Sequence, residues 1–154
     1  MVEYNNLRKI VKTTPGDIVS QIINPSTPGK ERNRLSKAIV ITIRAFMRQE
    51  KPDKNTKDML AFIILALREI SDGIDKSVTA WEKRGYWIKA DKYRMEWEWT
   101  SQYADQLHAA FKNEKWSEIS ALLMQTMGRF SDIKVSDKHR MGKPWIGALK
   151  QYQA

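Results

Sequence analysis

The chain has 154 residues and a formal net charge of +9, and 42% of its residues are hydrophobic. This length predicts a single domain, residues 1–154, with enough chain to bury a core. The six tryptophans argue against a disordered chain, because disordered sequences lack aromatic residues. The absence of cysteine excludes disulfides, thiolate zinc sites and cysteine nucleophiles, and it fits the reducing cytoplasm, where we expect the protein to act.

The positive charge lies toward both ends of the sequence, whereas residues 51–100 are nearly balanced. A basic surface favours acidic partners such as nucleic acid or anionic lipid, although many basic proteins bind neither. No apolar stretch typical of a signal peptide stands at the N-terminus. The longest apolar run, residues 59–67, is too short to span a bilayer, so we interpret it as core and expect no membrane partner.

The first part of the chain predicts only a short N-terminal helical segment. Residues 1–23 contain two short apolar patterns at helical spacing. The second pattern opens with Thr14 as a helix cap and Pro15 at the first helical position. The prolines within residues 24–29 then end that segment.

A long helix is predicted over residues 28–49, with Thr27 as its cap. Its first turns are basic, and residues 38–43 are almost wholly apolar, which indicates burial on several sides. Because this run is rich in β-branched residues, a strand is the alternative. We favour the helix because apolar residues on both sides of the run continue the helical spacing.

The next long helix follows a turn at residues 51–55 and is capped by Asn55 or Thr56. Gly73 lies inside its pattern, where a glycine costs up to about 1 kcal/mol relative to alanine. We interpret it as a tolerated surface glycine or a slight bend rather than as a hinge. Gly85 can supply a left-handed C-terminal cap, so we expect the chain to turn back there as a hairpin. The apolar positions of this helix step by three and four along Met59, Ile63, Leu67, Ile70, Ile74, Val78 and Trp81.

The chain is organised around a predicted amphipathic helix over residues 86–111. Its core-facing stripe consists of Tyr86, Ala90, Tyr93, Trp97, Thr100, Ala104, Leu107 and Phe111. Trp87 and Trp99 lie off that stripe, so they face a second helix, cover the tail or form an interface. We predict that Trp87 or Trp99 contributes to a self-association or partner surface, with a purely intramolecular role as the alternative.

A last helix is predicted over residues 116–130, and residues 131–154 lose the helical pattern and form a basic tail that packs on the rest. The predicted fold is therefore all-α. It is an up-and-down helical bundle of four main helices, with a short N-terminal helical segment and an irregular basic C-terminal tail.

No residue pattern indicates catalysis or a cofactor. Asp105 and His108 stand one helical turn apart, but bundle metal sites need such pairs from several helices, so we expect a surface pair and no metal. No glycine-rich phosphate loop follows a strand and no Gly-x-Ser-x-Gly occurs. The sequence thus favours a non-enzymatic protein without cofactors over an enzyme.

Two basic segments are the candidates for nucleic-acid contact, although charges on a solvated face are the commoner explanation. They consist of Lys30, Arg32, Arg34 and Lys37 near one end and Lys134, Lys138, Arg140 and Lys143 near the other. Our first hypothesis is a non-enzymatic interaction protein that associates with itself or another protein through aromatic surface. The alternative is a nucleic-acid-associated protein that uses these basic segments.

Overall fold

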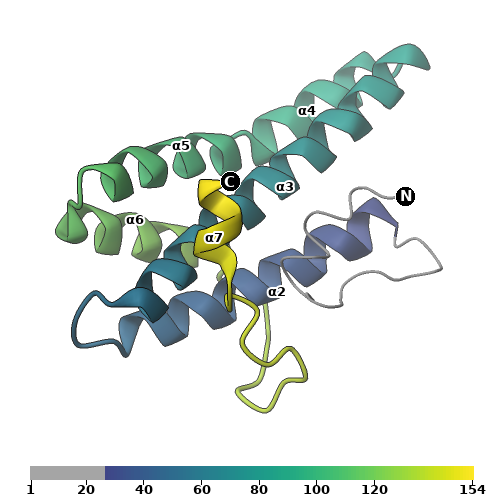
Figure 1. Ribbon diagram of the computed structural model, residues 1–154. Coiled ribbons are helices and arrows are strands. Elements are labelled where there is room, and N and C mark those ends of the chain that lie inside the picture. The colour runs from purple at the N-terminus through teal and green to yellow at the C-terminus, as the bar shows by residue number, and fades with distance from the viewer. Residues whose placement is uncertain (1–26) are drawn as a thin grey trace.

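The computed structural model describes residues 27–154, and every regular element in that range is a helix (Figure 1). The helices are α2 (Pro28–Met47), α3 (Lys54–Lys83), α4 (Trp87–Trp97), α5 (Trp99–Lys112), α6 (Trp116–Arg129) and α7 (Ala148–Gln153). The all-α prediction is confirmed, with α2, α3, α4 together with α5, and α6 as the four main helical segments. The helical segment predicted within residues 1–23 lies outside the described residues.

The longest helix, α3, forms the centre of the core. α2, α4, α5 and α7 pack against α3, whereas α6 packs on α5 and α2. Residues 59–64 of α3 are at most 1% exposed, because the apolar run is surrounded by helices on several sides. Residues 38–43 of α2 are also buried and helical, so the strand alternative is wrong. Thr27 caps α2 as predicted, since its hydroxyl accepts the backbone N–H of Lys30 at 3.2 Å.

The α3–α4 hairpin closes at Gly85, whose φ of 82° lies in the left-handed region. The Tyr86 N–H donates to the Trp81 carbonyl at 2.9 Å and the Gly85 N–H to the Glu82 carbonyl at 3.0 Å. These two bonds form the Schellman arrangement, which satisfies carbonyls at a helix end. The predicted hairpin is therefore present, and its end projects beyond the other helices (Figure 1).

The helix predicted over residues 86–111 is interrupted at Glu98, and the two parts change direction there (Figure 1). The bond from the Gln102 N–H to the Glu98 carbonyl is stretched to 3.4 Å, although Glu98 keeps helical dihedrals. Most of the predicted stripe faces the core as expected, with Ala90, Thr100, Ala104 and Leu107 buried. Tyr86 is the exception, since it is 54% exposed at the hairpin end.

After α6 the chain crosses α2 without regular structure and then returns to α3 through α7. The Trp145 indole N–H donates to the Asn55 side-chain oxygen at 2.8 Å, and Trp145 itself is buried. The Leu149 N–H donates to the Asp58 carboxylate at 2.9 Å, so a buried acid on α3 satisfies the first turn of α7. These two bonds fasten the end of the tail to α3.

Candidate functional site

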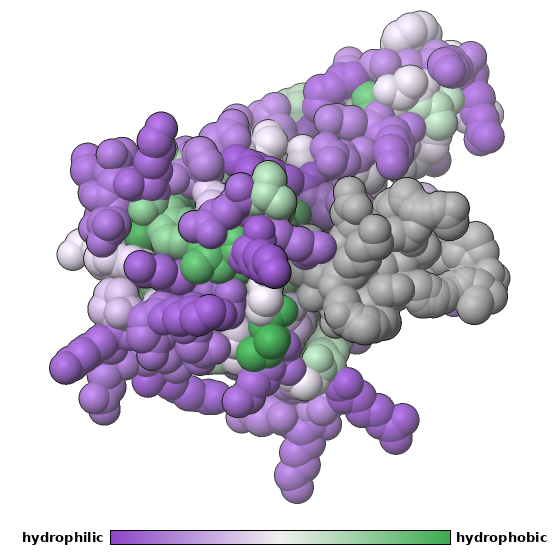
Figure 2. Space-filling model, viewed as in Figure 1, coloured by the Kyte–Doolittle hydropathy of each residue, from purple (hydrophilic) through white to green (hydrophobic). Residues whose placement is uncertain are grey.

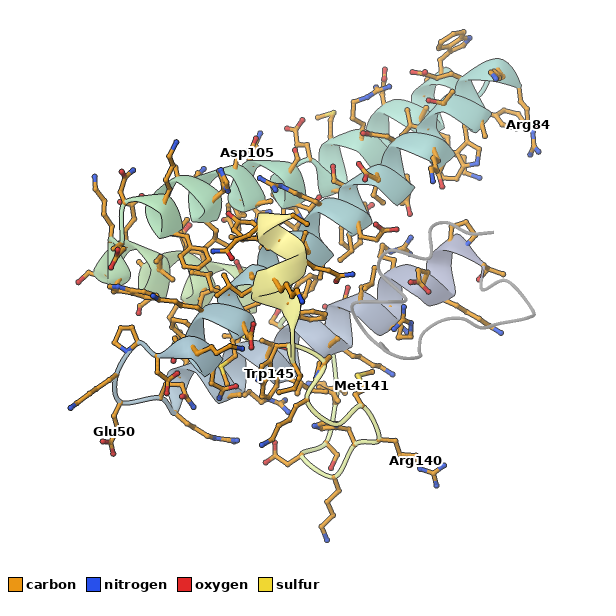
Figure 3. All side chains as sticks on the ribbon, viewed as in Figure 1. Glu50, Arg84, Asp105, Arg140, Met141 and Trp145 are labelled. Carbon is orange, nitrogen blue, oxygen red and sulfur yellow. The ribbon has the colours of Figure 1, made fainter. Side chains whose placement is uncertain are left out.

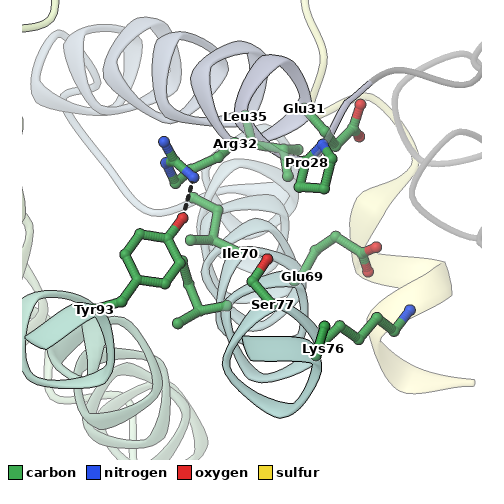
Figure 4. A pocket seen from close by; sticks show the side chains of 12 residues that line it. Pro28, Glu31, Arg32, Leu35, Glu69, Ile70, Lys76, Ser77 and Tyr93 are labelled. Carbon is green, nitrogen blue, oxygen red and sulfur yellow. Dashed lines mark hydrogen bonds between the residues drawn. The ribbon is translucent and has the colours of Figure 1, made fainter. Parts of the chain in front are cut away.

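Two of the four predicted basic residues at the start of α2, Arg32 and Arg34, are engaged within the chain. The Arg32 guanidinium lies 5.6 Å from the ring centre of Tyr93 and 5.1 Å from that of Trp97. It also donates to the Tyr93 hydroxyl (Figure 4). Arg34 binds Glu31 at 2.5 Å, one turn earlier on α2. Arg32 is thereby held in one orientation by aromatic rings, whereas the charge of Arg34 is balanced.

A groove runs along α2, between that helix and residues 129–136. It consists of two hollows, of about 420 and 490 Å³, and Phe130 and Ile133 border both of them. Gly29 lines the first hollow and Arg44 lines the second, so the groove follows most of α2. We call it the α2 groove.

Each hollow of the α2 groove has two cationic side chains in its wall. Arg32 and Arg129 line the first hollow, and Arg44 and Lys134 line the second. Arg129 lies over aromatic rings as Arg32 does, with its guanidinium 5.4 Å from the Trp99 ring centre. Rings that carry a guanidinium in this way fix its position while leaving most of its N–H groups available.

Acidic residues partly offset these cations. Glu96 and Asp132 line the first hollow. Asp137 lies beside the second, 3.5 Å from Arg44 and 3.9 Å from Arg48. Arg44 also donates to the Val135 carbonyl at 2.8 Å, which holds the tail segment against α2. The groove is therefore basic on balance but contains charges of both signs.

The structure separates the predicted nucleic-acid residues into two groups. Arg32 and Lys134 lie in the α2 groove. Outside its walls are Lys30, Arg34, Lys37, Lys138, Arg140 and Lys143, of which only Arg34 and Lys37 are half-buried. Figure 3 shows Arg140 pointing away from the helices and Trp145 lying close to them.

Sequence reasoning missed two groove residues, Arg44 and Arg129. Arg44 follows the apolar residues 38–43, and Arg129 is the last residue of α6. A cation in the last turn of a helix is expected from the helix dipole, so neither position indicated a site. Only the path of the tail across α2 brings them together.

The predicted interface residues Trp87 and Trp99 differ in exposure. Trp87 is 59% exposed, whereas Trp99 is only 6% exposed. Trp99 packs edge-on against Phe130 at 5.2 Å and against Tyr103 at 5.3 Å, measured between ring centres. Trp99 therefore lies in the chain's own core, which is the intramolecular alternative of the prediction, whereas Trp87 is exposed.

Exposed large apolar side chains are concentrated in residues 86–95, from the hairpin end to the later turns of α4. Of the seven that are exposed in residues 27–154, four lie here and the other three stand apart on α2, α6 and the tail. The four are Tyr86, Trp87, Ile88 and Met95, with exposures of 54, 59, 75 and 71%. We call this set the α4 surface. Figure 2 shows green and pale atoms among the polar ones at that end of the molecule.

The charges around the α4 surface are of both signs. Lys89, Asp91, Lys92 and Glu96 are all exposed on α4. Arg94 binds Asp91 and also the Glu82 carboxylate of α3, both at 2.6 Å, which ties the two arms of the hairpin together. The α4 surface thus combines apolar side chains with exposed charges of both signs.

A further hollow of about 320 Å³ lies between α2, α3 and α4 (Figure 4). Its walls include the apolar side chains of Leu35, Ile70 and Ile74, with Glu69 also in the lining. Burial raises the pKa of Glu69 above its usual value, and the nearby charges of Asp72 and Glu31 add to this. One carboxyl of raised pKa does not make a catalytic pair, so we assign no reaction to this hollow.

Asp105 and His108 do not form a joint site. Asp105 lies 4.0 Å from Arg68, and the His108 ring contacts the Tyr152 hydroxyl. Within the described part of the chain, no three histidine or acidic side chains gather as a metal would require. Among helices of residues 27–154, none has both the length and the apolar content needed to cross a bilayer.

Comparison of the chain with protein-family models, curated proteins and solved structures finds no match.

Proposed function

We propose that this chain is a non-enzymatic interaction protein of the cytoplasm that associates with itself through the α4 surface. The observation that carries the proposal is the concentration of exposed apolar side chains over residues 86–95. Contiguous apolar patches on a soluble domain mark interaction sites, whereas single exposed apolar residues need no explanation. Tryptophan and tyrosine are also the residues most enriched in interface anchors.

The charges on α4 support a second copy as the partner. Two cations and two acids surround the apolar side chains of the α4 surface, so two copies of α4 present opposite charges to each other. An isologous contact uses the same patch on both subunits, which such a mixed patch allows. The surface is small, so we expect a weak, concentration-dependent dimer rather than an obligate one.

Sedimentation velocity over a wide concentration range tests this proposal. The average mass of the wild-type protein should rise with concentration, and Ile88→Asp should weaken association at least about tenfold because it places a charge in an apolar contact. Met124→Asp is the matched control, since Met124 is 59% exposed on α6, away from the α4 surface. A wild-type protein that stays monomeric throughout, or an Ile88→Asp variant that associates normally, would contradict the proposal.

Nucleic-acid association is the second candidate, and the α2 groove is the observation that favours it. Arg32, Arg44, Arg129 and Lys134 lie along one concave surface, although they come from α2, α6 and the tail. Rows of cations are what a phosphate backbone requires, and most of the free energy of non-specific binding comes from such contacts. The two candidates use different surfaces, so both can apply to one protein.

A further inference from the structure

We propose that the α2 groove binds a single strand of nucleic acid, with the strand's phosphates beside Arg32 and Arg129 in one hollow and Arg44 and Lys134 in the other. This inference rests on the nucleic-acid candidate function and specifies its ligand. The groove follows α2 from Gly29 to Arg44, which corresponds to about 22 Å at roughly 1.5 Å per residue. That length fits the lower end of single-strand sites, which cover about 4–16 nucleotides.

The burial of α2 favours a single strand over a duplex. Helices that read duplex DNA enter its major groove, and this requires a helix with an exposed face. α2 is buried over residues 38–43 and is flanked by residues 129–136 on the side of the groove. A duplex meets only the rim of such a concavity, whereas the backbone of an unpaired strand can lie in it. Positively charged grooves that follow one backbone are typical of proteins that bind single strands.

Arg32 and Arg129 are prepared for anion binding by their surroundings. Neither guanidinium pairs with a carboxylate of residues 27–154, unlike Arg34, Arg44 and Arg94. Both are held over aromatic rings, so little side-chain freedom remains to be lost when a phosphate binds. Glu96 and Asp132 in the same hollow oppose the phosphate charge, so the expected affinity is modest and strongly dependent on salt.

The test measures fluorescence anisotropy of a fluorescein-labelled oligothymidylate of about 12 nucleotides and of a duplex of equal length, at several salt concentrations. The wild-type protein should bind the single strand more tightly than the duplex. The double variant Arg129→Gln and Lys134→Gln should bind the single strand at least about fivefold more weakly. The slope of log K against log salt should also flatten by about 1.4, at about 0.7 for each lost phosphate contact.

The matched control is Lys112→Gln with Lys115→Gln, which removes the same charge from exposed side chains at the α5–α6 turn. Circular dichroism verifies that both double variants keep the helical fold. An equal loss of affinity in the control overturns the groove as the site while leaving nucleic-acid association intact. Tighter binding of the duplex overturns the single-strand assignment. Failure of both ligands to bind at low salt removes the nucleic-acid candidate itself.

Discussion

Two helix ends in this protein use one hydrogen-bond pattern with different residues at the left-handed position. At the end of α3 that residue is Gly85, with φ of 82°. At the end of α5 it is Glu114, with φ of 52°. The Lys115 N–H donates to the Ala110 carbonyl at 2.9 Å, as the equivalent N–H does after α3. A side chain in this conformation costs roughly 1–2 kcal/mol, and glycine avoids the steric cost.

We therefore expect Glu114→Gly to increase the free energy of unfolding by about 1 kcal/mol. Gly85→Ala should lower it by a similar amount, because it introduces a Cβ where φ is 82°. Urea denaturation followed by circular dichroism measures both changes. An unchanged or lower stability for Glu114→Gly would contradict the idea that this turn is strained.

The raised pKa of Glu69 makes the stability of the fold depend on pH. Because burial raises its pKa above the usual value of 4.5, the folded state binds the Glu69 proton more tightly than the unfolded state does. The free energy of unfolding then falls as pH rises through the window that begins at that usual value. Glu69→Gln lacks this proton equilibrium, so its stability relative to wild type should increase as the pH rises above the usual value of 4.5.

Urea denaturation at several pH values measures this relative stability. Asp72, whose pKa is also raised by burial, stays in both proteins, although its interaction with Glu69 is lost in the variant. Glu50→Gln is the control, because Glu50 is an exposed acid in the turn between α2 and α3. A stability difference for Glu69→Gln that is independent of pH would contradict the prediction.

At the scale of helices, apolar periodicity predicted every long segment because each one buries an apolar stripe, either against α3 or, for α6, against α5 and α2. Turn chemistry was equally informative at Gly85 and Thr27, where the expected caps are present. The stripe over residues 86–111 failed at one point. Tyr86 extends past the end of the core, since it is 54% exposed at the hairpin end. Periodicity assumes that the core extends along the full length of a helix, and at Tyr86 it does not.

At the scale of the whole molecule, the α2 groove was beyond the reach of sequence patterns. It depends on where residues 130–147 cross α2, and that segment has no periodicity from which to predict its path. Charge clustering found Lys134 and Arg32 because they stand among other cations. It missed Arg44 and Arg129, whose relevance comes only from contacts between segments far apart in the chain.

The position of that segment depends on how its far end is fastened, which leads to a prediction about the tail. Asp58 is 3% exposed and accepts the Leu149 N–H at 2.9 Å, so Asp58→Ala removes the partner of a half-buried donor. We expect the free energy of unfolding to fall by about 2 kcal/mol, within the range for a hydrogen bond to a charged group. Hydrogen exchange should become much faster in α7 while the centre of α3 stays protected, because α2, α4 and α5 also cover α3.

Asp58→Asn provides the comparison, because its side-chain oxygen can still accept the Leu149 N–H. Its effect on exchange in α7 should be smaller than that of Asp58→Ala. If the α7 amides exchange equally slowly in all three proteins, then the tail is held by Trp145 and its bond to Asn55 rather than by Asp58. Asp58→Ala can also be tested for binding of a single strand. If its α7 amides exchange faster and its α2 groove binds a single strand more weakly than wild type, then anchoring of the tail on α3 shapes the groove.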